Sequence, residues 1–324
     1  IEDCPKEGWS IDDVAALIKK AKPKVTGMTV YTNEVEWTRA CIKEIRRISD
    51  TKIIVGGPHP TGLKKEIFND LEGIDFAVYS EGEIVLPLLV EAISANRLDN
   101  NSLGSIPNLL WRNGKDVIEN SCHLIEDLDS IGFPAWHLIK PDSYPRRPHG
   151  GFVRAYPFAP IITSRGCPYP CQFCAASLMQ GNKIRRRSVG NIMEEIQLLI
   201  RDYSIKEIHI EDDNFTFSKD FVMEFCETVI RSGINIFFSL PNGIRLDRID
   251  PEILSIMKRA NFYSFAVGIE SGSQRILDRM GKRLSLGLIN EKVAMIKKYG
   301  FIVKGFFMLG YPDETKEDMD LTIE

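Results

Sequence analysis

The stretch TSRGCPYPCQFCAAS (163–177) places Cys167, Cys171 and Cys174 within eight residues, directly after an apolar strand pattern. Positions that are four and three residues apart would share one face of a helix. Two prolines stand between these cysteines, and proline removes a backbone donor and clashes with the preceding helical turn. We therefore expect a loop that curls three thiols around one point at the end of a strand.

Three thiols in one loop indicate a metal site. Thiolates are ligands that zinc and iron–sulfur clusters prefer in proteins. A structural zinc ion and a four-cysteine cluster both need a fourth ligand, which residues 163–177 do not offer. Three ligands on a four-iron cluster leave one iron open to bind another molecule, so we predict a chemical role for the loop. A structural zinc site and inert thiols are the alternatives.

The sequence on the two sides of this loop shows different patterns of apolar, Pro and Gly residues. Short apolar strands alternate with helical periods over residues 10–94, which predicts an open, doubly wound parallel sheet (Rossmann-like α/β). A hairpin turning at Asn113-Gly114 follows, and then a Pro- and Gly-rich stretch without a clear period. Strand and helix patterns then resume with five βα steps, which suit a partial TIM-like (β/α)6 barrel. The predicted divisions are a domain over 1–130, a linker over 131–158 and a domain over 159–324.

Composition limits the classes of partner. A net charge of −4 gives no basic footprint, so nucleic acid is not expected. No apolar run approaches the ~20 residues that span a bilayer, so no membrane span is expected. The seven cysteines do not have the spacing of a disulfide-bonded framework, which favours a reducing, cytoplasmic setting. The chain opens at Ile1 in a strand-like pattern and stops at Glu324 in a helical one, so we expect a piece truncated at both ends.

The motif CPYPCQFC (167–174) after a first barrel strand resembles that of radical S-adenosylmethionine (SAM) enzymes. In that family three cysteines hold a 4Fe–4S cluster, and SAM chelates the open iron through its amino and carboxylate groups. One electron from the cluster cleaves SAM to methionine and a 5′-deoxyadenosyl radical, which abstracts a hydrogen from the substrate. The resemblance covers roughly residues 158–324 and lacks the family's sixth strand. It implies that Cys167, Cys171 and Cys174 are the metal ligands of a catalytic cluster.

The same resemblance implies contacts with SAM. Phe173 matches an aromatic residue that packs near the adenine. The family accepts the SAM amino group at the second strand end, commonly with Gly-Gly-Glu, and the residues that stand there in this chain are Glu211, Asp212, Asp213 and Asn214. A helix N-cap cluster is the alternative for these four. Arg245 would pair with the SAM carboxylate, unless it forms a structural ion pair. Glu270 and Ser271 would meet other SAM polar groups.

In the first domain, the order VTGMTVYT, VGGPHPT, YSEGE resembles the cobalamin-binding domain of cobalamin-dependent radical SAM enzymes. This resemblance implies three groups of cobalamin contacts: Thr29 and Thr32 at the nucleotide tail; Gly56, Gly57, Pro58 and His59 along the tail pocket; and Glu81, Gly82 and Glu83 at the next strand end. The D-x-H-x-x-G loop that supplies a cobalt ligand in other cobalamin domains is not visible, and His59 is not its equivalent. The lower axial ligand therefore stays open, and a degenerate domain without cofactor is the alternative.

Together the two resemblances imply methylation of an unactivated carbon. One SAM methylates cob(I)alamin, a second yields the radical, and the substrate radical takes the methyl group from methylcobalamin. The expected partners are a small-molecule or natural-product-type substrate and an electron donor such as flavodoxin or ferredoxin. The alternative is cobalamin-dependent radical oxidation, cyclisation or rearrangement, because FPAWHLIKPDSYPR (133–146) resembles linkers of anaerobic magnesium-protoporphyrin cyclases. A non-catalytic metal or electron-transfer protein is a third reading.

Overall fold

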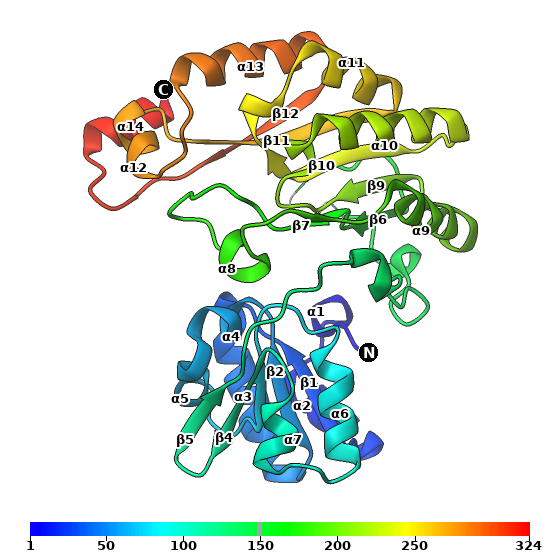
Figure 1. Ribbon diagram of the computed structural model, residues 1–324, viewed down its shortest axis with the longest axis vertical. Helices are drawn as coiled ribbons and strands as arrows, with labels where there is room; N and C mark the ends of the chain where they lie inside the picture. The colour runs from blue at the N-terminus through cyan, green and yellow to red at the C-terminus, as the bar shows by residue number, and fades with distance from the viewer. Residues whose placement is uncertain (148–150) are drawn as a thin grey trace. The chain divides into compact units, whose positions relative to one another are not determined.

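The computed structural model describes residues 1–147 and 151–324, which form two compact units (Figure 1). The first unit is Ile1–Glu126 with Leu178–Gly181, and the second is Asp127–Ser177 with Asn182–Glu324. Part of the predicted linker, residues 148–150, lies outside the described residues. Among those described, no helix has the length and apolar character needed to cross a membrane.

The first unit is built on a five-stranded mixed sheet in the order β1-β2-β3-β4-β5. Strands β1 (Val25–Thr29), β2 (Lys52–Gly56) and β3 (Phe76–Val78) are parallel neighbours, as the βα alternation predicts. The predicted hairpin forms β4 (Leu109–Asn113) and β5 (Asp116–Glu119), and β4 pairs antiparallel with β3. The sheet is therefore parallel in its βα part and antiparallel where the hairpin extends it.

Helices cover both faces of this sheet. Ile53 and Val55 of β2 face one apolar core with Ile42 of α3, whereas Ile54 faces a second core with Leu89 of α6. This alternation follows from the two-residue period of a strand, and it makes the unit doubly wound as predicted. The helices are α1 (Cys4–Glu7), α2 (Ile11–Ala21), α3 (Val35–Ile48), α4 (Pro58–Leu63), α5 (Ile67–Asp70), α6 (Val85–Ser94) and α7 (Asn100–Gly104).

The second unit is an all-parallel five-stranded sheet in the order β12-β11-β10-β9-β6. Its strands are β6 (Phe158–Ile161), β9 (Glu207–Ile210), β10 (Phe237–Ile244), β11 (Phe262–Glu270) and β12 (Ile302–Phe307). A small antiparallel pair, β7 (Ser164–Arg165) and β8 (Arg185–Arg186), stands apart from this sheet. The prediction of a partial barrel of successive βα steps is confirmed.

Helices pack on one face of the second sheet (Figure 1). Ile208 and Ile210 of β9 join the apolar core with Ile196 of α9 and Phe225 of α10. Ser188 and Ser218 begin these two helices, because each hydroxyl accepts a backbone N–H of the first turn. The helices after β8 are α9 (Val189–Tyr203), α10 (Lys219–Ser232), α11 (Pro251–Arg259), α12 (Gln274–Arg279), α13 (Leu286–Lys298) and α14 (Lys316–Ile323), whereas most of α8 (Ala176–Gln180) groups with the first unit.

The opposite face of β9 carries a buried polar cluster. The Glu207 carboxylate accepts the backbone N–H groups of Arg154 and Ala155, both at 2.7 Å, and lies 2.7 Å from His209 Nε2. The Tyr263 hydroxyl lies 2.6 Å from Glu207 Oε1, and burial is the main cause that raises its pKa. A buried carboxylate that meets this many donors is fully compensated. The cluster thereby fixes residues 154–155, the end of the predicted linker, inside the second unit.

Candidate functional site

The three-cysteine segment is a non-helical loop between β7 and α8, as the prolines predict. Cys167 and Cys171 are half-buried and Cys174 is exposed, and all three thiols are free. The Cys174 N–H donates to the Cys171 carbonyl at 3.1 Å, which closes a turn between them. Burial raises the pKa of Cys167, and the adjacent thiols of Cys174 and Cys171 raise it further. The loop therefore brings the thiols close enough to influence one another electrostatically.

This donor set fits a cluster with one open iron. The loop supplies three thiols and no fourth cysteine, and the cations Arg245 and Lys282 both lower the pKa of Cys171, against the larger effect of burial. Thiolates beside buried cations suit an anionic iron–sulfur cluster. Over residues 1–147 and 151–324, no three His, Cys, Asp or Glu side chains are arranged to hold a single metal ion.

Arg245, at the end of β10, lies directly against the cluster loop. Its Nη1 is 4.0 Å from Cys171 Sγ, and its guanidinium stacks 3.6 Å from the centre of the Tyr169 ring. Its Nε donates to Asp247 at 3.0 Å, and its Nη2 donates to the Lys282 carbonyl at 2.9 Å. The alternative, a structural ion pair, is thus present, and a contact between Arg245 and the SAM carboxylate stays a prediction.

The four polar residues after β9 divide into two kinds. Asp212 is buried and accepts the Thr163 N–H at 2.6 Å, and the hydroxyls of Thr163 and Ser164 at 2.5 and 2.6 Å. Asp213 accepts the Gly166 N–H at 3.2 Å. Burial is the main cause that raises the pKa of both carboxyls. These two acids therefore bind the chain that enters the cluster loop, and Asp212 has little capacity for another partner.

The other two residues, Asn214 and Glu211, have side-chain atoms that could still form hydrogen bonds. Among residues 1–147 and 151–324, neither Nδ2 nor Oδ1 of Asn214 has a partner, although the residue is only 2% exposed, and Glu211 Oε1 is likewise buried and unpaired. Burial raises the pKa of Glu211. Unpaired buried polar groups are costly, so this pair fits a ligand that both donates and accepts hydrogen bonds, as SAM does. The N-cap alternative is wrong, because Ser218 caps the following helix.

Glu270 and Ser271, at the end of β11, have partners within the protein. Glu270 Oε1 accepts from Lys282 Nζ at 2.6 Å, and that ammonium lies 5.7 Å from the Phe173 ring centre. Ser271 is fully buried, and its Oγ lies 3.1 Å from the Thr322 hydroxyl of α14. Lys282 is not recognisable from the sequence, because it follows Glu270 by twelve residues in another element and belongs to no motif.

The predicted cobalamin residues lie at the carboxyl ends of β1, β2 and β3, which share one edge of the parallel part of the sheet. Thr29, Thr32 and Glu83 are exposed there, and Gly56, Gly57, Pro58 and Gly82 are half-buried. This polar edge with partly open glycine backbone fits an extended ligand. A Cβ on Gly57, whose φ is +100°, would lie 3.0 Å from Thr29 Cγ2, so this glycine also lets the two strand ends approach.

His59 and Glu81 are buried at the same edge and bonded internally. His59 Nε2 lies 2.7 Å from Asp70 Oδ2, and its Nδ1 lies 3.2 Å from the Thr32 hydroxyl. Glu81 Oε2 accepts the Ile125 N–H at 2.7 Å. Because both imidazole nitrogens are engaged, the arrangement agrees with the expectation that His59 is not a cobalt ligand.

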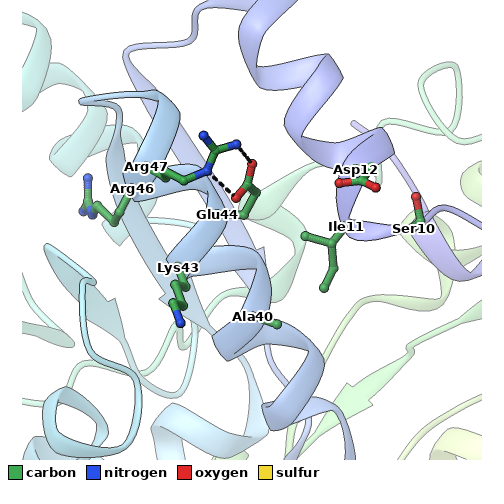
Figure 2. A pocket seen from close by; sticks show the side chains of 8 residues that line it. All are labelled: Ser10, Ile11, Asp12, Ala40, Lys43, Glu44, Arg46 and Arg47. Carbon is green, nitrogen blue, oxygen red and sulfur yellow. Dashed lines mark hydrogen bonds and ion pairs between the residues drawn. The ribbon is translucent and has the colours of Figure 1, made fainter.

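A hollow between α2 and α3 in the first unit stands apart from these residues (Figure 2). Its lining contains cations, but Arg47 Nε donates to Glu44 at 2.8 Å, and Arg46 Nη1 donates to the Thr51 carbonyl at 2.7 Å. None of the predicted cofactor residues lines it, so it does not contribute to the candidate site.

Comparison with known proteins identifies both units. The profile of the Radical SAM superfamily matches residues 161–324, and that of the B12 binding domain matches residues 3–90. The chain belongs to the radical SAM superfamily. The two domains of this radical SAM enzyme imply a 4Fe–4S cluster, SAM and cobalamin as its cofactors, and the resemblance seen in the sequence is confirmed.

Curated relatives include both methyltransferases and a cyclase. An uncharacterized methyltransferase of Pyrococcus horikoshii is 32% identical over 98% of this chain and 67% of its own length. Cytidylyl-2-hydroxyethylphosphonate methyltransferase of Streptomyces wedmorensis is 29% identical over 94% and 61%. Anaerobic magnesium-protoporphyrin IX monomethyl ester cyclase of Rubrivivax gelatinosus is 26% identical over 99% and 57%. The chain thus spans between 57% and 67% of the length of these relatives.

A solved structure shares the fold. The radical SAM methyltransferase TsrM from Kitasatospora setae, with cobalamin and a [4Fe-4S] cluster bound, matches with a TM-score of 0.75 at 19% identity. The match covers 96% of this chain and 62% of that one. It extends over both units, so the order of a B12-type domain and a partial barrel is common to the two proteins.

Proposed function

We propose that this radical SAM enzyme methylates an unactivated carbon of a small-molecule or natural-product-type substrate. The observations that carry the proposal are the open donor set at Cys167, Cys171 and Cys174 and the side chain of Asn214, which has no partner among the described residues. Curated relatives that are named methyltransferases support methyl transfer over other radical chemistry.

When bound, the cluster and SAM would supply the radical chemistry, and cobalamin would supply the methyl group. The protein binds and orients them. Cys167, Cys171 and Cys174 hold the cluster. Asn214 and Glu211 meet the SAM amino group with the atoms that lack partners. Asp212 and Asp213 instead hold the entry of the cluster loop in place.

Other residues orient the rest of SAM. Arg245 is held by Tyr169 and Asp247 with Nη1 directed at the loop, so its charge is placed for the SAM carboxylate. Phe173 packs against the adenine. Ser271 is fully buried against Thr322, so in this proposal it fixes the strand end and does not bind SAM directly.

In the first unit, the edge formed by β1, β2 and β3 holds cobalamin. The exposed hydroxyls of Thr29 and Thr32 and the glycine backbone at Gly56 and Gly57 contact its nucleotide tail, with Pro58, Gly82 and Glu83 beside them. His59 supports this edge, because its imidazole joins Thr32 to Asp70. We further propose a reducing, cytoplasmic setting with flavodoxin or ferredoxin as the electron donor, which agrees with seven free cysteines.

A second candidate function is radical oxidation or cyclisation without methyl transfer, which the similarity to a magnesium-protoporphyrin cyclase favours. Full-length protein, reconstituted anaerobically with iron, sulfide, cobalamin, SAM and a strong reductant, separates the two. Methyl transfer requires both 5′-deoxyadenosine and S-adenosylhomocysteine by mass spectrometry, and label from methyl-labelled SAM in the product. Formation of 5′-deoxyadenosine alone, with an unlabelled product, would reject methylation and favour the second candidate.

A further inference from the structure

The turn that follows α12 packs against the cluster loop. The Gln172 N–H, between two of the predicted ligands, donates to the Met280 carbonyl at 3.0 Å. Gly281 has a φ of +66°, and a Cβ on it would lie 3.0 Å from the Pro170 carbonyl oxygen. Only a glycine allows this approach without displacing the loop. The turn therefore braces the cluster loop from the side of β11 and α12.

The next residue of this turn places a buried ion pair beside the loop. Lys282 Nζ lies 2.6 Å from Glu270 Oε1, and each side chain is only 10% exposed. A Cβ on Gly268 would lie 2.3 Å from Glu270 Oε1 and 2.5 Å from Lys282 Nζ, so a larger residue there would require the ends of these two side chains to shift. A buried pair is held in one geometry, because a solvated alternative is not accessible to either charge.

The pair is oriented with its cation toward the predicted ligands. Lys282 Nζ lies 5.7 Å from the Phe173 ring centre, and Phe173 directly precedes Cys174. The ammonium is therefore the end of the pair that lies against the cluster loop, and Glu270 holds it there through the 2.6 Å contact.

We propose that the Lys282–Glu270 pair makes the cluster easier to reduce, and that both residues are positioning residues that act through this field. The inference rests on the proposed function, because it requires the cluster to be bound at Cys171. Reduction adds one negative charge to the cluster, and a fixed cation in a poorly solvated environment favours that charge. The carboxylate holds the ammonium in place and opposes part of its effect.

Two single substitutions have opposite expected signs. Lys282→Met removes the cation and leaves the carboxylate, so the ratio of reduced to oxidised cluster at a fixed potential should fall about tenfold. Glu270→Gln removes the anion and keeps the cation, so the ratio should rise about threefold. The double variant should lie between these two. A contact that only supports the fold would not produce shifts of opposite sign.

The measurement is a redox titration of full-length protein with reconstituted cluster, followed by electron paramagnetic resonance, with iron and sulfide content determined for each variant. Lys282→Arg keeps the charge and should titrate as wild type. Lys298→Met removes an exposed lysine of α13 and should also leave the midpoint unchanged. If the clusters assemble and both single variants shift in the same direction, or neither shifts, the inference is wrong. A wild-type protein that binds no cluster would instead reject the proposed function.

Discussion

The two units place their candidate residues in the same topological position and treat them differently. In both units the predicted sites lie at the carboxyl ends of parallel strands. In the second unit, Asn214 and Glu211 are left with buried polar atoms that have no partner. In the first unit, His59 and Glu81 are bonded to other residues of the chain. Buried side chains at the strand ends of the second unit thus keep unused hydrogen-bonding capacity, whereas His59 and Glu81 in the first unit are already paired.

This difference predicts that mutation of Asn214 or Glu211 should mainly affect ligand binding, whereas mutation of His59 or Glu81 should mainly affect the stability of the fold. A buried polar atom without a hydrogen-bond partner lowers the stability of the free protein, and a ligand that bonds to it removes this penalty. A residue with internal partners stabilises the fold, and its loss reaches the ligand only indirectly. The following substitutions separate the two cases, beginning with the largest effect.

Cys171→Ala should abolish cluster binding. Three thiolates are the minimum set in this loop, and Cys171 is the one that Arg245 and Lys282 approach. Iron and sulfide content should fall to background after reconstitution, and SAM cleavage should fall by more than about a hundredfold. Cys122→Ala, at an exposed thiol of the first unit, is the control and should leave both unchanged. Retained SAM cleavage in Cys171→Ala would refute the ligand assignment.

Asn214→Leu should change stability and binding in opposite directions. The leucine has a similar volume and leaves no buried polar atom unpaired, so the protein without SAM should be more stable by about 1 kcal/mol. SAM affinity should fall about tenfold, because the hydrogen bonds that Asn214 is free to make are lost. Thermal unfolding and equilibrium dialysis measure the two effects.

The control for this substitution is Asn235→Leu, at an exposed position of the same unit, which should alter neither quantity. A loss of stability without a change in SAM affinity would show that Asn214 serves the fold, and the contrast between the two units would fail at its central residue.

His59→Ala tests the first unit. It removes the bonds to Thr32 and Asp70 from a buried position, so the unit should lose about 2 kcal/mol of stability. Cobalamin retained after gel filtration should fall about threefold, with iron content unchanged, because the polar edge loosens without losing a ligand. His123→Ala, at an exposed histidine of the same unit, should change neither. Complete loss of cobalamin from a protein of unchanged stability would instead make His59 a direct contact.

Much of the fold follows from local sequence patterns. The strand and helix periods predicted the elements of both units, and Asn113-Gly114 predicted the hairpin, because these signals are local. The antiparallel pairing of β4 with β3 was not predicted, since edge pairing depends on tertiary packing. The chain between β2 and β3 forms short helical pieces and not one continuous helix, because Lys64 adopts a φ of +55°.

In the candidate site, too, contacts between residues that are distant in the sequence could not be predicted from local patterns. The cysteine motif is local and was visible in the sequence. Asp212, predicted as a SAM contact, is instead bonded to Thr163 and Ser164, which lie 49 and 48 residues away in the sequence. Lys282 was missed because only the fold brings it to Glu270. Residue type and spacing identify which groups gather at a strand end, whereas their remaining hydrogen-bonding capacity depends on distant partners.

The smallest expected effect concerns Asp75, which shows that charges in the first unit serve its own fold. Burial raises the pKa of this carboxyl, but hydrogen bonds from the Ile53 N–H at 2.8 Å, from Lys52 at 2.9 Å and from Arg46 outweigh it, and the pKa is lowered overall. A carboxyl whose pKa is lowered by folding stabilises the folded state at pH values above its unfolded-state pKa of about 4. This stability is lost as the pH falls below about 4 and through the folded value.

Asp75→Asn should therefore cost about 1 kcal/mol at pH 7 and flatten the acid side of the stability profile. Hydrogen exchange of peptides from β2, measured in the full chain at pH 7 and near pH 3, reports the stability of the first unit separately from that of the second. Asp116→Asn, at an exposed position of the hairpin, is the control. Equal slopes for wild type and Asp75→Asn would mean that the carboxylate is not charged in its pocket, and the first unit would then gain nothing from this internal pairing.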